Sequence, residues 1–187
     1  MIESSPATLS SPVTASDPKT MSAPHSRTGL WDRLTVALAT GLGTGRLPWF
    51  PGTWGSVLGV GIYAALAVAG IPLEAIALLA IVAFVVGIPL CTKAAQVLGA
   101  GEDPGVIVYD EIVGMMFTLL FVPLNWQSAL VGFCLFRLFD TRKPWPVHRF
   151  EALHGGLGIM ADDFAAGLAA GGALWAARWA LLSSMAG

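Results

Sequence analysis

The sequence predicts an all-α fold, a polytopic membrane helical bundle with about five transmembrane helices and short interfacial helices. Only 12% of its 187 residues are charged and 55% are hydrophobic, whereas about 25% of the residues of a typical soluble domain are charged. A soluble globule of this length needs more charge to cover its surface, so we expect lipid to be part of its solvent. The net charge of −2 argues against the basic surface that binds nucleic acid.

The first 28 residues differ from the rest of the chain. They are rich in Ser, Pro and Thr and contain no apolar run, so they cannot bury enough surface to offset the entropy of ordering. They also lack the apolar core of a secretory signal. We expect residues 1–28 to be a disordered tail and residues 29–187 to form one membrane-embedded domain.

The first elements follow from apolar spacing and turn residues. Residues 29–40 have apolar side chains at helical intervals and predict a short interfacial helix. No charge occurs in residues 47–73 or 75–92, and about 20 apolar residues are needed to cross the hydrocarbon as a helix. Since prolines and glycines interrupt the first stretch near its start and its end, the predicted spans are 53–70 and 72–98.

The next uncharged stretch, residues 112–136, is predicted to be a hairpin of two spans. Val122-Pro-Leu-Asn125 in its middle is typical of a tight turn. We therefore expect helices over 104–122, with Asp103 as N-cap, and over 126–143, ending before a proline. A last span is expected over 159–184, and a second interfacial helix over 147–153.

Basic residues concentrate on one side of this arrangement. With five crossings, the loops before residue 53, at 99–103 and at 143–158 share a face, and only Arg178 lies near the opposite one. The positive-inside rule places the basic face in the cytoplasm. We expect a multi-pass membrane protein with its chemistry facing the cytoplasm.

Acidic side chains gather at the same face and indicate a divalent cation site. Asp110 and Glu111 are expected about two turns into their helix, and Asp162 and Asp163 are expected to open the last one. Hard oxygen ligands suit Mg²⁺, which also relieves the repulsion between clustered carboxylates. The expected metal ligands are Asp110, Glu111, Asp140, Asp162 and Asp163. An alternative for Asp162 and Asp163 is helix N-capping without a metal.

Basic and glycine-rich segments beside the carboxylates are candidates for binding phosphate. Glycines and a helix N-terminus can direct N–H groups at an anion, and Arg or Lys can hold phosphate oxygens. The expected phosphate-binding residues are Gly43, Gly45, Thr53, Arg137 and Lys143. The glycine loop could instead re-enter the membrane interface, and basic residues could instead contact anionic headgroups.

Three stretches in this order carry a resemblance to a known family. They are Gly43-x-Gly-x-x-Pro-x-x-Pro-Gly-Thr-x-Gly-Ser56, Asp103-Pro-Gly-x-Ile-Val-x-Asp-Glu-x-x-Gly-Met115, and Phe136-Arg-x-x-Asp-x-x-Lys-Pro-Trp-Pro146 followed by His154-Gly-Gly-x-Gly-Ile-Met-x-Asp-Asp-x-x-Ala-Gly167. Over about residues 29–185 the chain resembles phosphatidylglycerophosphatase A, a bacterial inner-membrane lipid phosphatase. The resemblance implies Mg²⁺-dependent hydrolysis of phosphatidylglycerophosphate, a membrane phospholipid, to phosphatidylglycerol and phosphate.

The catalytic roles are our own hypothesis, placed on residues that match these motifs. Mg²⁺ would be held by Asp110, Asp140 and either Asp162 or Asp163. Glu111 or a paired aspartate would take a proton from water, Lys143 with Arg137 would neutralise the phosphoryl oxygens, and His154 would protonate the leaving glycerol oxygen. The expected catalytic set is Asp110, Glu111, Asp140, Lys143, His154 and Asp163. Alternatives are a small ion or solute carrier with a carboxylate cation site, and a phosphatidyltransferase-type enzyme.

Overall fold

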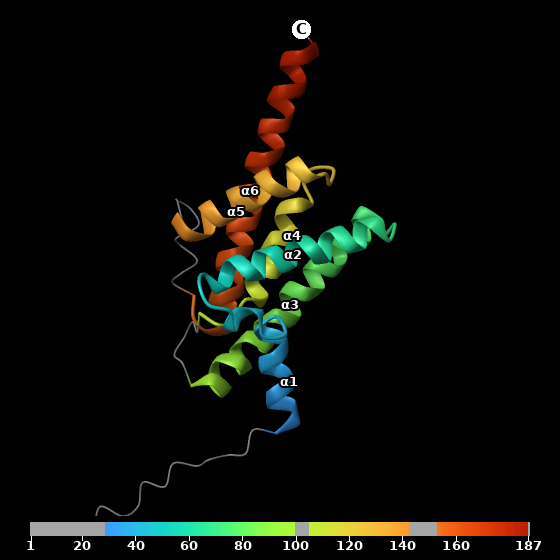
Figure 1. Cartoon of the computed structure of the whole chain (residues 1–187). Helices are drawn as coiled ribbons and strands as arrows, with labels where there is room; N and C mark the ends of the chain where they lie inside the picture. Colours follow the sequence, from blue (N-terminus) through green and yellow to red (C-terminus); the bar gives the residue numbers. More distant parts are fainter. Residues whose placement is uncertain (1–28, 100–104, 143–152, 187) are drawn as a thin grey trace, which may run out of the picture.

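The computed structural model describes residues 29–99, 105–142 and 153–186, and these residues form an all-helical bundle without strands (Figure 1). This confirms the predicted all-α class for the described part of the chain. The elements in chain order are α1 (Leu30–Ala39), a 3₁₀ turn η1 (Thr44–Arg46), α2 (Pro51–Val68), α3 (Leu73–Leu98), α4 (Tyr109–Leu119), α5 (Trp126–Arg142) and α6 (Gly155–Ala186).

Helix α4 is the centre of the bundle. Nine of its eleven residues are buried, and it contacts α2, α3, α5 and α6. Phe117 of α4 stacks edge-on against Phe164 of α6, with ring centroids 4.8 Å apart, and Phe84 of α3 lies 4.9 Å from Phe164. Such aromatic pairs stabilise a core beyond the area that they bury, so α4 is held from several sides.

Glycines let α4 and α6 approach backbone to backbone. A Cβ atom at Gly114 would lie 2.7 Å from the carbonyl oxygen of Asp163, and one at Gly167 would overlap the carbonyl oxygen of Gly114. The Thr118 hydroxyl bridges the two helices, at 3.1 Å from the Gly114 carbonyl and 3.3 Å from that of Gly167. Small residues at such crossings are typical of helix packing in membranes.

Three of the described helices, α2, α3 and α6, are long and apolar enough to span a membrane. The expected count of about five is not confirmed, because α4 has 11 residues and would extend only about 16 Å, and α5 has 17. The predicted hairpin between them is present. Asn125 and Ser128 cap α5 reciprocally: the Ser128 N–H donates to Asn125 Oδ1 at 2.8 Å, and the Asn125 N–H donates to Ser128 Oγ at 2.9 Å.

The ends of two helices differ from the prediction. Helix α4 begins at Tyr109 rather than at 104. Val106 instead packs against Gly45 of the glycine-rich loop, and the Val108 N–H donates to the carbonyl of Ala39, at the end of α1, at 3.0 Å. Helix α6 begins at Gly155 rather than at 159. The predicted tail 1–28, the N-cap Asp103 and residues 147–152 of the second interfacial helix lie outside the described residues.

Candidate active site

Three carboxylates from two helices converge in the bundle. One oxygen each of Asp110, Glu111 and Asp163 lies within 4.8 Å of the others. Asp110 and Glu111 occupy the first turn of α4, whereas Asp163 lies more than two turns into α6. The expected depths of the two pairs are therefore wrong and reversed. Because α6 begins eight residues before Asp163, N-capping by Asp162 and Asp163 is excluded.

The three carboxylates are mostly buried, and two of their oxygens lack hydrogen-bond partners. Asp110 is 9% exposed and Asp163 is 4% exposed. Oδ1 of Asp110 and Oε2 of Glu111 are buried and have no hydrogen-bond partner in the described structure. Burial raises the pKa of Asp110 well above its usual value, and the carboxylates of Glu111 and Asp163 raise it further.

These observations fit a divalent cation. Two buried carboxylate oxygens that lack donors are what a bound cation would satisfy, and the donor set consists of hard oxygens only. A cation would also compensate the repulsion among three carboxylates. The cluster therefore could hold a metal ion through Asp110, Glu111 and Asp163, three of the five predicted ligands.

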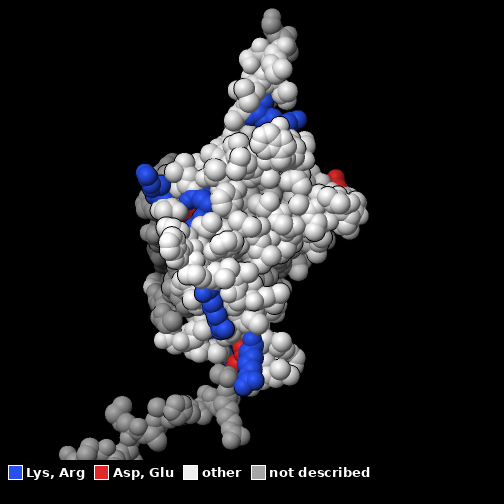
Figure 2. Space-filling view, in the orientation of Figure 1, with Lys and Arg blue, Asp and Glu red and all other residues white. Residues whose placement is uncertain are grey.

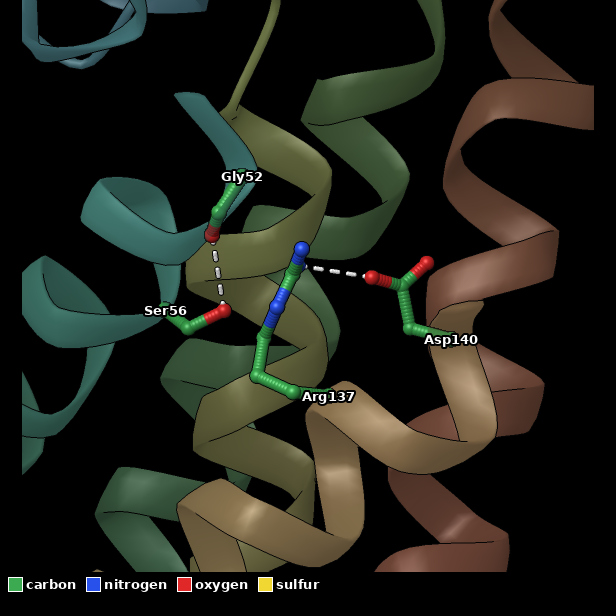
Figure 3. Close-up of polar contacts among 4 residues, drawn as sticks. All are labelled: Gly52, Ser56, Arg137 and Asp140. Atoms are coloured by element: carbon green, nitrogen blue, oxygen red, sulfur yellow. Dashed lines mark hydrogen bonds and ion pairs between the residues drawn. The ribbon is translucent and has the colours of Figure 1, made fainter. Parts of the chain in front are cut away.

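Arg137 of α5 provides positive charge beside the cluster. Its Nη1 atom lies 2.7 Å from Oδ2 of Asp140, one turn further along the same helix, and both side chains are mostly buried. Figure 3 shows Arg137 between Asp140 and Gly52. Asp140 is not among the three clustered carboxylates; it pairs with Arg137 and acts electrostatically on Glu111 and Asp163.

The N-terminus of α2 completes this side of the site. A Cβ atom at Gly52 would overlap Oε1 of Glu111 and lie 2.8 Å from Nη1 of Arg137. The buried Ser56 hydroxyl donates to the Gly52 carbonyl at 2.8 Å (Figure 3). Thr53, a predicted phosphate ligand, follows Gly52 in the first turn of α2. Gly52 was not predicted as a site residue, although it stands inside the Pro-Gly-Thr signature.

The other predicted residues lie as follows. Gly45 is packed against Val106 and Val108, where a Cβ atom would overlap the Val106 carbonyl. Gly43 has open space around it and adopts φ 95°, a conformation that favours glycine. His154 is exposed immediately before α6. Asp162 precedes Asp163 and is half-buried, and Lys143 lies outside the described residues.

Together, the fold and the site define a helical membrane protein with a buried carboxylate site beside an arginine. The profile of the family described as phosphatidylglycerophosphatase A matches residues 37–178. The chain belongs to the phosphatidylglycerophosphatase A family, and it is a phosphatase.

Curated relatives agree with this assignment. Phosphatidylglycerophosphatase A of Escherichia coli is 39% identical over 140 residues, covering 74% of this chain and 80% of the relative. The protein of the same name from Haemophilus influenzae is 39% identical over 133 residues, covering 70% and 80%. A putative phosphatidylinositol-3-phosphatase of Bacteroides thetaiotaomicron is 36% identical over 155 residues, covering 79% and 96%. No solved structure matches the chain.

Proposed function

We propose that the chain hydrolyses the phosphomonoester of phosphatidylglycerophosphate to phosphatidylglycerol and phosphate, with Mg²⁺ as its cofactor. The observation that carries this proposal is the cluster of Asp110, Glu111 and Asp163, with two unpartnered oxygens, beside the guanidinium of Arg137. An acidic cation site next to a fixed cation suits hydrolysis of a phosphomonoester, because the phosphoryl group in the transition state carries negative charge on its three equatorial oxygens. The names of the two 39% identical relatives supply the substrate.

In this mechanism Glu111 has two tasks, as a metal ligand and as the proton acceptor, and the other residues have one task each. Asp110, Glu111 and Asp163 would hold Mg²⁺, which when bound polarises the phosphoryl group and makes water acidic. Glu111 accepts the proton of the attacking water. Arg137 neutralises the phosphoryl oxygens while the phosphorus–oxygen bond to glycerol breaks, and Asp140 orients Arg137 through its 2.7 Å ion pair.

Residues around this centre have supporting tasks. The N–H group of Gly52, in the first turn of α2, would assist in binding phosphate, whereas the Thr53 N–H already donates to the Phe50 carbonyl at 2.9 Å. The glycine-rich loop with Gly43 and Gly45 borders the same turn. His154 protonates the leaving glycerol oxygen, and Lys143 adds positive charge; both tasks are our hypothesis for residues that match the family motif.

The proposed setting is a bacterial inner membrane with the site facing the cytoplasm. The three apolar helices support a membrane location. In this proposal α4 and α5 together return the chain to the face from which it entered, so that the three long spans leave the basic loops on one face. The positive-inside rule assigns that face to the cytoplasm.

The carrier alternative is less well supported. Carriers place their cation sites near the bilayer midplane, at broken helices in repeated halves. The chain instead belongs to a family of phosphatases. We therefore favour the enzyme, which would leave the acyl chains in lipid and admit only the headgroup.

A substrate panel tests the proposal. Purified full-length protein should release phosphate from detergent-dispersed phosphatidylglycerophosphate when Mg²⁺ is present, and a chelator should abolish the release. Phosphatidylinositol 3-phosphate and phosphatidic acid should be cleaved more slowly. Unchanged release in the chelator would refute the metal role, and faster cleavage of the inositol lipid would overturn the substrate.

A further inference from the structure

The half of α6 that lies away from the carboxylates carries one basic residue, Arg178. This half projects beyond the other helices (Figure 1). Arg178 is the only Lys or Arg in α6, and it lies 15 residues after Asp163, about 22 Å along the helix axis. Arg178 is thus too far from the carboxylate cluster to take part in the chemistry proposed there.

Two grooves meet at Arg178. One, of about 270 Å³, lies between the start of α5 and α6 and has Val131, Leu174 and Leu181 among its apolar walls. The other, of about 220 Å³, lies on the other side of Arg178, beside Trp175 and Trp179. Both grooves are open to the surroundings of the protein, and Arg178 and Leu182 line both of them.

No acidic group in the described structure neutralises Arg178. Neither groove has an Asp or Glu in its lining, and Arg178 forms no ion pair with a described residue. Of the polar residues across the first groove, Asn125 and Ser128 already bond to each other in the cap of α5, and Gln127 carries no charge. Figure 2 shows basic atoms on the projecting part of α6 without acidic atoms beside them in that view.

We propose that Arg178 and its two grooves bind a phospholipid of the leaflet opposite the active site. The guanidinium holds the phosphodiester oxygens, for which its planar fork of donors is suited, and the acyl chains lie along the apolar groove walls. Trp175 and Trp179 fit this position, because tryptophan concentrates where hydrocarbon meets headgroups. An unneutralised guanidinium favours a lipid with net negative charge.

Lipid retention and thermal stability test this site in the full-length protein. The protein is reconstituted in nanodiscs of phosphatidylcholine, with or without phosphatidylserine, an anionic phosphodiester that is neither the proposed substrate nor the proposed product. We expect phosphatidylserine to raise the Tm of the wild type. Arg178→Gln should lose this rise and retain about fivefold less phosphatidylserine on delipidation, and Arg178→Lys should retain part of both.

The matched control is Arg33→Gln, which removes an exposed arginine from α1 and should keep the response of the wild type. Equal lipid retention by wild type and Arg178→Gln would overturn the proposal. A change in oligomeric mass without a change in lipid retention would overturn it in favour of a second copy of the chain. Arg178→Gln should also keep phosphatase activity within about twofold; inactivity of both proteins would count against the proposed function and not against this site.

Discussion

Asp110, Glu111 and Asp163 are the side chains on which the proposed chemistry depends, because their charges are not balanced within the described protein. Oδ1 of Asp110 and Oε2 of Glu111 lack donors, and an uncompensated buried polar group costs about 1–3 kcal/mol. Such a cost persists in a protein when a ligand removes it during function. A bound cation accounts for the arrangement.

Removal of a clustered carboxylate should abolish catalysis. We expect Asp110→Asn and Asp163→Asn to lower Mg²⁺-dependent phosphate release at least about 100-fold, since even partners of metal ligands change activity 10–100-fold. Asp32→Asn is the matched control, because Asp32 is a carboxylate on α1 that pairs with Lys93 at 3.3 Å. Near wild-type rates in both site variants would refute the assignment.

The response of stability to pH should depend on the metal. Since burial raises the pKa of Asp110, its neutral form stabilises the metal-free fold below the ordinary carboxyl pKa, and this contribution is lost as pH rises through the raised value. Mg²⁺ should offset that loss. The Tm should therefore fall with rising pH in a chelator, and it should depend less on pH with Mg²⁺ or in Asp110→Asn. An equal slope of Tm against pH in all three cases would contradict this prediction.

Residues that mark helix ends explain which helix boundaries could be predicted from the sequence. The helices expected at 53–70, 72–98 and 126–143 lie within two residues of α2, α3 and α5 at each end, because prolines and a capping asparagine mark their starts. The start of α6 was predicted at 159 rather than at Gly155, because Gly155 and Gly156 are typical of a loop. They serve packing instead: a Cβ at Gly156 would overlap the Ile88 carbonyl of α3.

The pairing of side chains within the site could not be predicted from the sequence, because it depends on contacts between helices. The predicted helix ends placed the acidic residues at one face of the bundle, and the structure brings Asp110, Glu111 and Asp163 together. The sequence motifs could not distinguish these clustered carboxylates from Asp140. Asp140 pairs with Arg137, one turn away on α5, where α2 also approaches closely. Tertiary contacts between helices decide that division of roles.

The contact of α2 with the site should be sensitive to one methyl group. Gly52→Ala would displace Glu111 and Arg137, and a shift of about 1 Å near reacting groups costs about 100-fold in rate. Gly61→Ala on the same helix meets nothing within 4 Å and should keep wild-type rates. Steady-state kinetics of the two variants provide the measurement, and equal rates would show that the close approach has no role.

At the scale of the whole molecule, the bundle predicts a fixed topology. The turn between α2 and α3 and the end of α6 should face away from the cytoplasm, and the loop before α2 should face it. In a Cys134→Ala background, an impermeant thiol reagent outside spheroplasts should label Ile71→Cys and Met185→Cys but not Leu42→Cys. The opposite pattern would invert the protein in the membrane.

The backbone contact between Gly114 and Gly167 has a consequence for ion selection. Because the helices touch here and the Thr118 hydroxyl lies within hydrogen-bond distance of a carbonyl on each, moving them apart would break this packing, and the ligand spacing cannot widen freely to suit a larger ionic radius. Mg²⁺ forms bonds of about 2.0–2.1 Å and Ca²⁺ of about 2.3–2.6 Å. We therefore expect Ca²⁺ to compete with Mg²⁺ but not to replace it in turnover, which titration of phosphate release with each ion would show.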